Sequence, residues 1–383
     1  MASEAGTQPQ SPTASASRLQ SLDVFRGITI AAMTLVNHPG DGRTVYEPLK
    51  HATWHGWTPT DFVFPFFLFI VGVAITLALS KRMDAGTPRR SLIGQIVRRS
   101  AIIFGLGLVL NGFPYYDLST LRIPGVLQRI AVCYLVASLL YLYTGIRAQL
   151  AILLSLLIGY WGLLTLIPVP GAGAGLLTPE GNLSGYIDRI FLEGHMYRIT
   201  KVFDPEGILS TLPSIGTVLL GILTGHWLKK APNGTRCTLG LAAAGALLTS
   251  LGLAWDPLFP INKMIWTSSY ALFTAGLALL LFAACYWLTD VRGYRFWSKP
   301  FLVFGMNAIT VYVLSGLLSR VLTLIRWTDA AGGALDLKRY LYQQIFLPLA
   351  DPINASLLWA ISYVLLWLGI MWIFYHRRIF LRV

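Results

Sequence analysis

Three of the six histidines in the chain, His38, His51 and His55, fall within eighteen residues between two long apolar segments. An imidazole titrates near neutral pH, so it can accept a proton from a nucleophile or give one to a leaving group. A segment that only has to sit in lipid needs no such group, and the cluster is therefore a candidate reaction centre. The alternative is structural, because interfacial histidine and tryptophan side chains also anchor loops among lipid headgroups.

The same three histidines suggest a second chemistry, a zinc site, because His51 and His55 lie four residues apart. The spacing is weak support, since neither a helical pattern nor an acidic ligand in the expected register accompanies it. We therefore expect no bound metal.

Composition excludes an ordinary soluble fold. Apolar residues make up 55% of the chain and charged residues 12%, against roughly 25% charged residues in soluble domains. A helix needs about twenty apolar residues to cross the hydrocarbon layer. The sequence predicts an all-α, polytopic integral membrane protein with about ten transmembrane helices, near residues 22–38, 62–80, 94–112, 123–143, 149–167, 211–229, 238–255, 265–288, 300–325 and 353–375.

Positive charges indicate how the chain crosses the membrane. Lysine and arginine concentrate near both ends and in alternate connections such as 81–99. Because cytoplasmic loops carry the excess of these residues, both termini are predicted to be cytoplasmic, with His51 and the 168–210 loop outside. The net charge of +13 is explained by this topology together with attraction to the anionic lipid bilayer, and a cytoplasmic anionic ligand is the further alternative. No nucleic-acid partner is expected, because the cations are divided among short loops and tails.

Two segments depart from the membrane pattern. Residues 1–17 are rich in Ser, Ala, Thr and Pro and are predicted to be a disordered tail, because they have too few apolar groups to offset the entropy of ordering. Residues 18–383 form the transmembrane domain, interrupted by the long 168–210 loop, and loops of this length are usually functional or disordered. The three cysteines are an odd number within or beside predicted spans, so no disulfide framework is implied.

Several polar residues lie where lipid would penalise them. Asp23 and Arg26 are one helical turn apart in the first span, Arg129 is in the fourth, and Asn307 and Tyr312 are in the ninth. Each must face protein or water. Buried pairs between helices would explain any one of them, and a polar route through the bundle would explain them together. Such a route fits a solute transporter or an enzyme acting across the bilayer, and the histidines favour the enzyme.

Eight short motifs occur in one order along the chain and resemble the heparan-alpha-glucosaminide N-acetyltransferase family, bacterial members included. The shared order makes the resemblance specific, whereas one motif would mean little. The motifs are Leu22–Gly27, Val36–Asn37, Lys50–Trp54, Asp61–Pro65, Arg122–Arg129, Gly185–Arg189, Asp204–Leu209 and Ile261–Lys263.

The resemblance implies transfer of an acetyl group from cytoplasmic acetyl-CoA to the amine of a glucosamine-type sugar on the far side. It places the essential histidine at His51 and gives His38 and His55 no catalytic role. Tyr312–Gly316 lacks the His-Glu pair of the human-type enzyme, so no role is assigned there. The chain begins at the core shared by the family, without the extra lumenal domain, so we expect a multi-pass protein of the bacterial inner membrane.

Acetyl transfer to an amine requires proton removal and stabilisation of an oxyanion. His51 suits the proton transfer, Asn37 the thioester carbonyl, and Asp61 the orientation of the imidazole. Direct transfer is favoured over an acetyl-imidazole on His51 because the pantetheine arm is long, and both stay open. Arginines bind phosphate well, so coenzyme A is expected to contact Arg26, Arg98 and Arg99, with Asn37, Arg129 and Asn307 as further contacts.

The acceptor sugar is expected to bind on the outer side. Carboxylates and an arginine there suit sugar hydroxyls or an ammonium, and a tryptophan offers a stacking face. The predicted contacts are Trp54, Arg122, Asp188, Asp204, Glu206 and Asn262. Loop scaffolding is the structural alternative, above all for Asp204, because Asp-Pro-Glu-Gly also favours a turn. An amino-sugar transporter and an O-acyltransferase of a cell-envelope glycan remain alternatives, and the oligomeric state, including a homodimer, is open.

Overall fold

Long helices build almost all of the protein. The computed structural model describes residues 19–231, 234–328 and 333–380, so the predicted tail 1–17 lies outside the described residues. The long helices are α1 (Gln20–Asn37), α2 (Val63–Asp84), α3 (Arg89–Gly112), α4 (Val126–Tyr143), α5 (Ile146–Leu166), α7 (Thr211–Lys230), α8 (Thr235–Trp255), α9 (Ser268–Tyr286), α11 (Ala308–Leu324) and α13 (Pro352–His376).

Shorter elements connect the long helices. They are the α-helices α6 (Leu183–Phe191), α10 (Lys299–Met306) and α12 (Leu337–Leu341), the 3₁₀ turns η1 (Glu47–Leu49) and η2 (Pro59–Phe62), and the π-helical turns η3 (Trp287–Val291) and η4 (Tyr342–Phe346). Among the described residues the strands are β1 (Arg326–Thr328) and β2 (Ala334–Asp336), which pair antiparallel. The predicted all-α class is confirmed.

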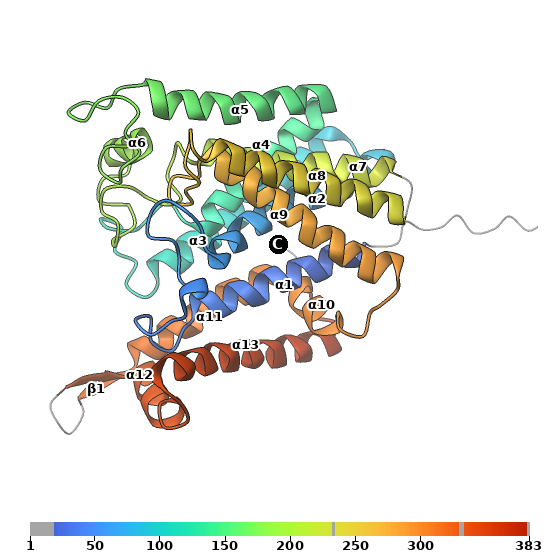
Figure 1. Cartoon of the computed structure of the whole chain (residues 1–383). Helices are drawn as coiled ribbons and strands as arrows, with labels where there is room; N and C mark the ends of the chain where they lie inside the picture. Colours follow the sequence, from blue (N-terminus) through green and yellow to red (C-terminus); the bar gives the residue numbers. More distant parts are fainter. Residues whose placement is uncertain (1–18, 232–233, 329–332, 381–383) are drawn as a thin grey trace, which may run out of the picture.

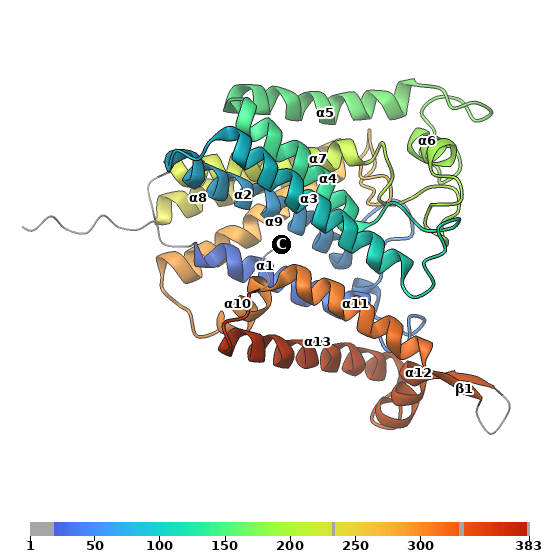
Figure 2. The same cartoon turned by 180° about the vertical axis from the view of Figure 1, so that it is seen from behind.

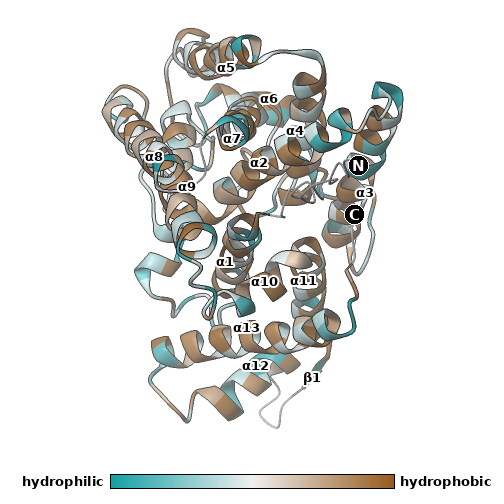
Figure 3. Ribbon diagram, turned by 90° about the vertical axis from the view of Figure 1, so that its right-hand side faces the viewer, coloured by the Kyte–Doolittle hydropathy of each residue, from teal (hydrophilic) through white to brown (hydrophobic). Residues whose placement is uncertain are grey.

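The long helices lie side by side along one common direction, with α5 at one edge, α13 at the other and α1 between them (Figures 1 and 2). The closest neighbours are α2 with α7, α3 with α4, and α8 with α9, while α1 packs on α2, α9 and α10. Seen along the bundle, apolar residues cover most of the helices and α1 lies near the centre (Figure 3). One apolar core runs through the bundle, with Phe25, Leu68 and Phe282 fully buried in it.

The number of spans is lower than predicted when length and composition alone are counted. In the described residues, eight helices are long and apolar enough to cross a membrane, or nine if the bent pair α10 and α11 is one span. The segment outside this count is α1, whose charged Asp23 and Arg26 reduce its apolar character. Burial inside the bundle allows a less apolar helix, because the other helices and not lipid surround it. The protein is therefore an all-α polytopic membrane protein.

The predicted ninth span, 300–325, is two helices and not one. Helices α10 and α11 meet at Asn307 with a bend of 80°. Close packing accompanies the break: a Cβ on Gly305 would lie 2.1 Å from the backbone oxygen of Asp23, and one on Gly27 would lie 1.8 Å from that of Phe301. The two glycines let the backbones of α1 and α10 touch, as small residues do between membrane helices.

Three loops meet at one end of the bundle, which we call the histidine face. The indole N–H of Trp54 donates to the Leu177 carbonyl over 2.7 Å, and the Gly56 N–H donates to the Ile261 carbonyl over 2.8 Å. The 38–62, 168–210 and 256–267 loops are thereby joined. The start of α1 and the end of α13 lie at the opposite end of the bundle (Figure 1), and the chain after α13 folds back, where the Ile379 carbonyl accepts a hydrogen bond from Asn307.

Candidate active site

A short turn before α2 places the carboxylate of Asp61. Thr58 caps η2 in a capping box: its hydroxyl and backbone N–H donate to Asp61 Oδ2 over 3.1 and 3.0 Å, and the Asp61 N–H donates back to the Thr58 carbonyl. The Ala52 N–H adds a third bond to Oδ2, over 3.1 Å. A capping box pairs Ser or Thr with an acidic or amide side chain three residues later, and Thr58 and Asp61 have this spacing. It leaves Oδ1 of the fully buried Asp61 free to meet a different partner.

That partner is His51, whose Nδ1 lies 2.7 Å from Asp61 Oδ1. A carboxylate accepts hydrogen bonds, so the contact assigns the imidazole proton to Nδ1 and leaves Nε2 as the basic nitrogen. The His51 side chain is 43% exposed on the histidine face. The pair therefore presents an oriented, accessible base.

A third charged group, Lys263, completes the cluster. Its Nζ lies 3.3 Å from Asp61 Oδ1, and 2.8 and 3.3 Å from Nδ1 and Nε2 of His51. Only 14% of the Lys263 side chain is exposed. Burial lowers the pKa of Lys263, while the carboxylates of Asp61 and Glu206 oppose that change. Sequence reasoning singled out the neighbouring Asn262 and missed Lys263, although both belong to the Ile261–Lys263 motif.

Asn262 shapes the turn that carries Lys263. The Asn262 side chain is fully buried; its Oδ1 accepts the Ile265 N–H over 3.1 Å, and its Nδ2 lies 3.3 Å from His55 Nδ1. The Tyr270 hydroxyl fixes the same region by donating to the Asp61 carbonyl. These contacts favour a scaffold role for Asn262 over the predicted contact with sugar.

The other two clustered histidines lie in different surroundings. His38 is buried, with Nδ1 3.0 Å from the Thr34 carbonyl and its ring stacked on Tyr363 at 4.7 Å. His55 faces Asn262. Of the three, His51 has the carboxylate partner. Within the described residues no three His, Cys, Asp or Glu side chains are grouped as metal ligands would be.

An ion-pair group borders the cluster. Arg122 binds Asp204 through two hydrogen bonds of 2.9 and 2.6 Å and binds Glu206 over 2.5 Å, and its guanidinium lies 4.4 Å from the Tyr197 ring centre. Burial lowers the Arg122 pKa, but the two carboxylates outweigh it and raise that pKa above its ordinary value. Asp204 is fully buried, whereas the Glu206 side chain keeps 11% exposure. Glu206 is thus the member of the predicted acceptor set with an accessible carboxylate beside Lys263.

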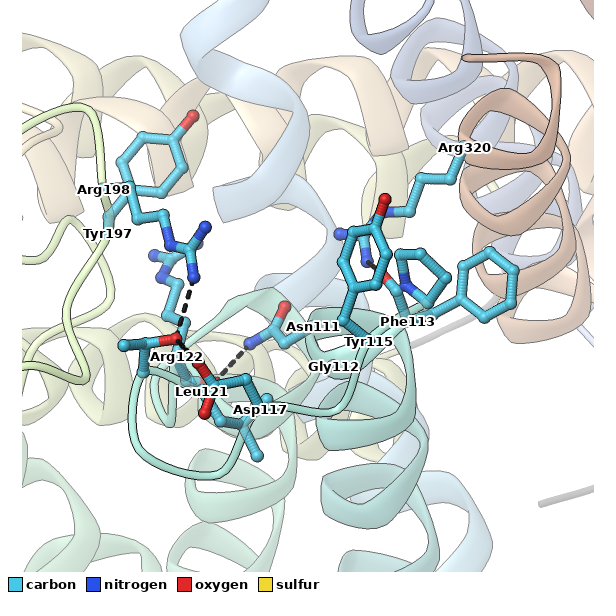
Figure 4. Close-up of a pocket in the computed structure, with 12 residues that line it drawn as sticks. Asn111, Gly112, Phe113, Tyr115, Asp117, Leu121, Arg122, Tyr197, Arg198 and Arg320 are labelled. Atoms are coloured by element: carbon cyan, nitrogen blue, oxygen red, sulfur yellow. Dashed lines mark hydrogen bonds between the residues drawn. The ribbon is translucent and has the colours of Figure 1, made fainter. Parts of the chain in front are cut away.

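A cavity of about 350 Å³ opens next to Arg122, between the end of α3 and α11. Figure 4 shows Arg122, Tyr197 and Arg198 on one side of it and Arg320 on the other. Its size falls within the range of small-molecule sites. Arg122 therefore lies between Glu206, on the side of Lys263, and the cavity, on the other side.

Comparison with known proteins shows which family the chain belongs to. The family model described as "Heparan-alpha-glucosaminide N-acetyltransferase, catalytic" matches residues 18–254. The chain belongs to this family. It is similar to heparan-alpha-glucosaminide N-acetyltransferase of Mus musculus, with 33% identity over 365 residues, 80% of this chain and 54% of that protein. The Homo sapiens protein of the same name is 34% identical over 355 residues, 77% of this chain and 52% of its own length.

The chain therefore spans about half the length of the curated relatives it matches. The range matched by the family's catalytic model contains His51, Asp61 and Arg122, and it ends before Lys263 and Asn307. The resemblance inferred from the motifs is confirmed for the family.

Two more predicted residues of the acceptor site hold the 168–210 loop together. Asp188, fully buried, accepts the N–H groups of Asp204 and Ile208 over 3.1 and 2.9 Å. Burial raises its pKa to about 6 despite these bonds. The Trp54 ring packs edge-on against Phe203 at 5.1 Å, with its N–H bonded inside the loop. These contacts favour a structural role in the loop for Asp188 and Trp54.

Two predicted cofactor residues lie toward the histidine face. Arg129 is 2% exposed; its Nη2 donates to the Gly207 carbonyl over 3.1 Å and to the Ser210 hydroxyl, and its guanidinium lies 5.2 Å from the Trp266 ring centre. Its Nε and Nη1 have no hydrogen-bond partner among the described residues. Asn37, at the end of α1, lines a small cavity beside Tyr312. No hydrogen bond links Asn37 to His51 in the described part of the chain.

The remaining predicted cofactor residues lie elsewhere. Arg26 Nη1 donates to Asp23 Oδ1 and to the Gly305 carbonyl over 3.3 and 3.2 Å, and Asn307 donates to the Ile379 carbonyl over 3.2 Å, so both lie at the α10–α11 break. Arg98 and Arg99 project from the exposed side of α3, where Arg99 lies 5.0 Å from the ring centre of Tyr134. The structure thus brings Arg26 and Asn307 together and leaves the α3 pair on another helix.

Proposed function

We propose that the protein transfers an acetyl group from acetyl-CoA to the amine of a glucosamine-type sugar, with His51 as the general base. The observation that carries the proposal is the contact of 2.7 Å between His51 and the buried carboxylate of Asp61. Membership of the N-acetyltransferase catalytic family supports acetyl transfer.

The chemistry follows from which nitrogen of His51 is basic. The acceptor amine attacks the thioester carbonyl carbon, a C–N bond forms, and the electron pair of the carbonyl moves to oxygen. His51 Nε2 takes the proton from nitrogen, while Asp61 holds the ring and stabilises the imidazolium. The intermediate then collapses, the C–S bond breaks, and His51 returns the proton to the sulfur of coenzyme A.

We propose direct transfer and not an acetyl-histidine relay. A relay would require the imidazole to move between two substrates, but the contact with Asp61 and the loop bonds of Ala52 hold it at one place. The pantetheine arm can instead bring the thioester to the histidine. Wild-type protein incubated with labelled acetyl-CoA and no acceptor should then carry no stoichiometric label on His51.

Sidedness is part of the proposal. The excess of cations on the connections of the face opposite His51 supports a cytoplasmic position for that face, and in a bacterial inner membrane His51 would then face the periplasm. Acetyl-CoA would enter past Arg26, Arg98 and Arg99. The acceptor would arrive from outside, with Glu206 near its ammonium and the cavity beside Arg122 open to the rest of the sugar.

One observation favours a transporter as the second candidate. Discontinuous helices often form substrate sites in transporters, and α10 and α11 meet at a bend of 80°. A transporter would move labelled amino sugar into vesicles that contain no acetyl-CoA.

The deciding experiment is incubation of purified protein with radiolabelled acetyl-CoA and a panel of amino sugars and matched sugars without an amine. We expect an alkali-stable N-acetyl product with the amino sugars only. An alkali-labile ester would identify an O-acyltransferase instead, and uptake without acetylation would identify the transporter.

A further inference from the structure

Asp61 poses a problem for His51 as a base. A carboxylate within about 4–6 Å favours the charged form of a neighbouring histidine and raises its pKa. The Asp61 carboxylate is fully buried, and its Oδ1 lies 2.7 Å from His51 Nδ1. A histidine held as imidazolium near neutral pH has no free nitrogen to take a proton from an amine.

The positive charge of Lys263 can offset the negative charge of Asp61. Its ammonium lies 3.3 Å from the same Oδ1 that His51 contacts, and 2.8 and 3.3 Å from Nδ1 and Nε2 of the imidazole. Because Nδ1 carries the proton shared with Asp61, the ammonium can donate to the carboxylate, and it acts on the ring through its charge. A cation at this place offsets the charge of Asp61 and disfavours a second proton on the ring.

The other polar and charged groups near His51 have partners of their own. Lys50, the preceding residue, forms an ion pair of 2.6 Å with Glu47 on the exposed surface. Glu206 acts on Lys263 and is itself bound to Arg122. His55 faces Asn262. Among the described residues, Asp61 and Lys263 are therefore the charged groups in contact with His51.

We propose that Lys263 is a positioning residue that keeps His51 neutral, with Nε2 unprotonated, by sharing the Asp61 carboxylate. The inference rests on the proposed acetyl transfer for its catalytic meaning, but not for its titration behaviour. No bond is made or broken on Lys263 during the reaction. It donates to the carboxylate throughout, and the proton that His51 takes from the amine leaves with coenzyme A.

The test is the titration of His51 in Lys263→Met, followed by NMR of protein labelled at the histidine rings, with His51→Gln to assign the signal. We expect the His51 pKa to rise by at least about one unit when the cation is lost. Lys263→Arg, which keeps the charge, should titrate close to wild type. Lys50→Met is the matched control and should leave the His51 signal unchanged.

The pH dependence of turnover should shift together with the His51 pKa. The acid limb of kcat/KM should move to higher pH in Lys263→Met by the amount that NMR gives, and raising the pH should recover most of the lost rate. Removing the other charge as well, in Lys263→Met with Asp61→Asn, should bring the His51 pKa back down. A thermal-unfolding measurement on each variant identifies misfolding.

Two results would overturn the inference: an unchanged His51 pKa in folded Lys263→Met, or lost activity that no pH recovers. Failure of the proposed function looks different. In that case wild type would transfer no acetyl group to any amino sugar, yet the His51 signal would still shift in Lys263→Met.

Discussion

The histidine face and the region around Arg26 hold their predicted functional residues in different ways. At the histidine face, His51, Asp61 and Lys263 are all in mutual hydrogen-bonding distance, and capped turns fix their loops. Around Arg26, backbone carbonyls at a helix break hold the polar side chains, while Arg99 projects from an exposed helix surface. The first arrangement fits the proposed proton transfer, and the second fits the proposed contacts with coenzyme A.

The largest expected effect concerns sidedness, because labelling of a cysteine from one side of the membrane is all or none. A cysteine introduced at the exposed Glu193 should react with an impermeant thiol reagent in intact cells, and one at the exposed Arg90 only after the membrane is opened. The three native cysteines are buried and give a low background. Asn182 is unsuitable as a reporter, because it is fully buried and caps α6. The reverse labelling pattern would exchange the two faces.

Removing the base should have the largest effect on rate. His51→Ala should lower kcat for amine acetylation by about 10²–10⁴, the usual loss for a general base, while the protein still binds acetyl-CoA in a calorimetric titration. His55→Ala is the matched control and should cost far less, because in the described structure His55 Nδ1 faces the Asn262 amide and not a hydrogen-bonded carboxylate. Near-normal turnover by His51→Ala would remove His51 from the mechanism altogether.

Local sequence pattern anticipated part of the site and not the rest. Polar residues beside apolar segments drew attention to His51 and Asp61, which lie ten residues apart, and the capping box between Thr58 and Asp61 holds the carboxylate that His51 contacts. Lys263 is 212 residues from His51, so no periodicity or local spacing links the two. Only the packing of the loop before α9 onto the loop before α2 places the ammonium there.

The fold, too, was predicted where the sequence signal is local and not where it depends on packing. Hydropathy located the membrane helices because about twenty apolar residues are a strong local signal. The break at Asn307 was not predicted, because the 300–325 segment is continuously apolar enough to be read as one span, and the backbone contact between Gly305 and α1 that accompanies the bend is a tertiary contact. Within the 168–210 loop, α6 covers Tyr186–Arg189, which belong to one of the motifs of the resemblance.

The binding region should give a smaller effect, on KM and not on the chemical step. Arg26→Gln or Arg99→Gln should raise the KM for acetyl-CoA by about tenfold if one charge-assisted phosphate contact of roughly 1.5 kcal/mol is lost. Arg236→Gln is a control for total charge, since Arg236 is also an exposed cation near the opposite face. The acceptor KM should change little. If the acceptor KM rises instead, these arginines belong to the sugar site.

The smallest effect on turnover is expected at Asp188, which supports the 168–210 loop without touching the cluster. Burial raises its pKa to about 6 from 3.8, so the folded protein holds a proton that the unfolded chain releases. Its contribution to stability is therefore complete below about pH 4 and is lost as the pH rises to about 6, on the order of 3 kcal/mol for a shift of this size. Asp188→Asn cannot ionise, so its melting temperature in detergent should lack that decline, while its KM and kcat for acetylation stay within about twofold of wild type. A decline of equal size in wild type and Asp188→Asn would place the titrating group elsewhere, and a large loss of acetylation by the folded variant would move Asp188 from the scaffold into the acceptor site.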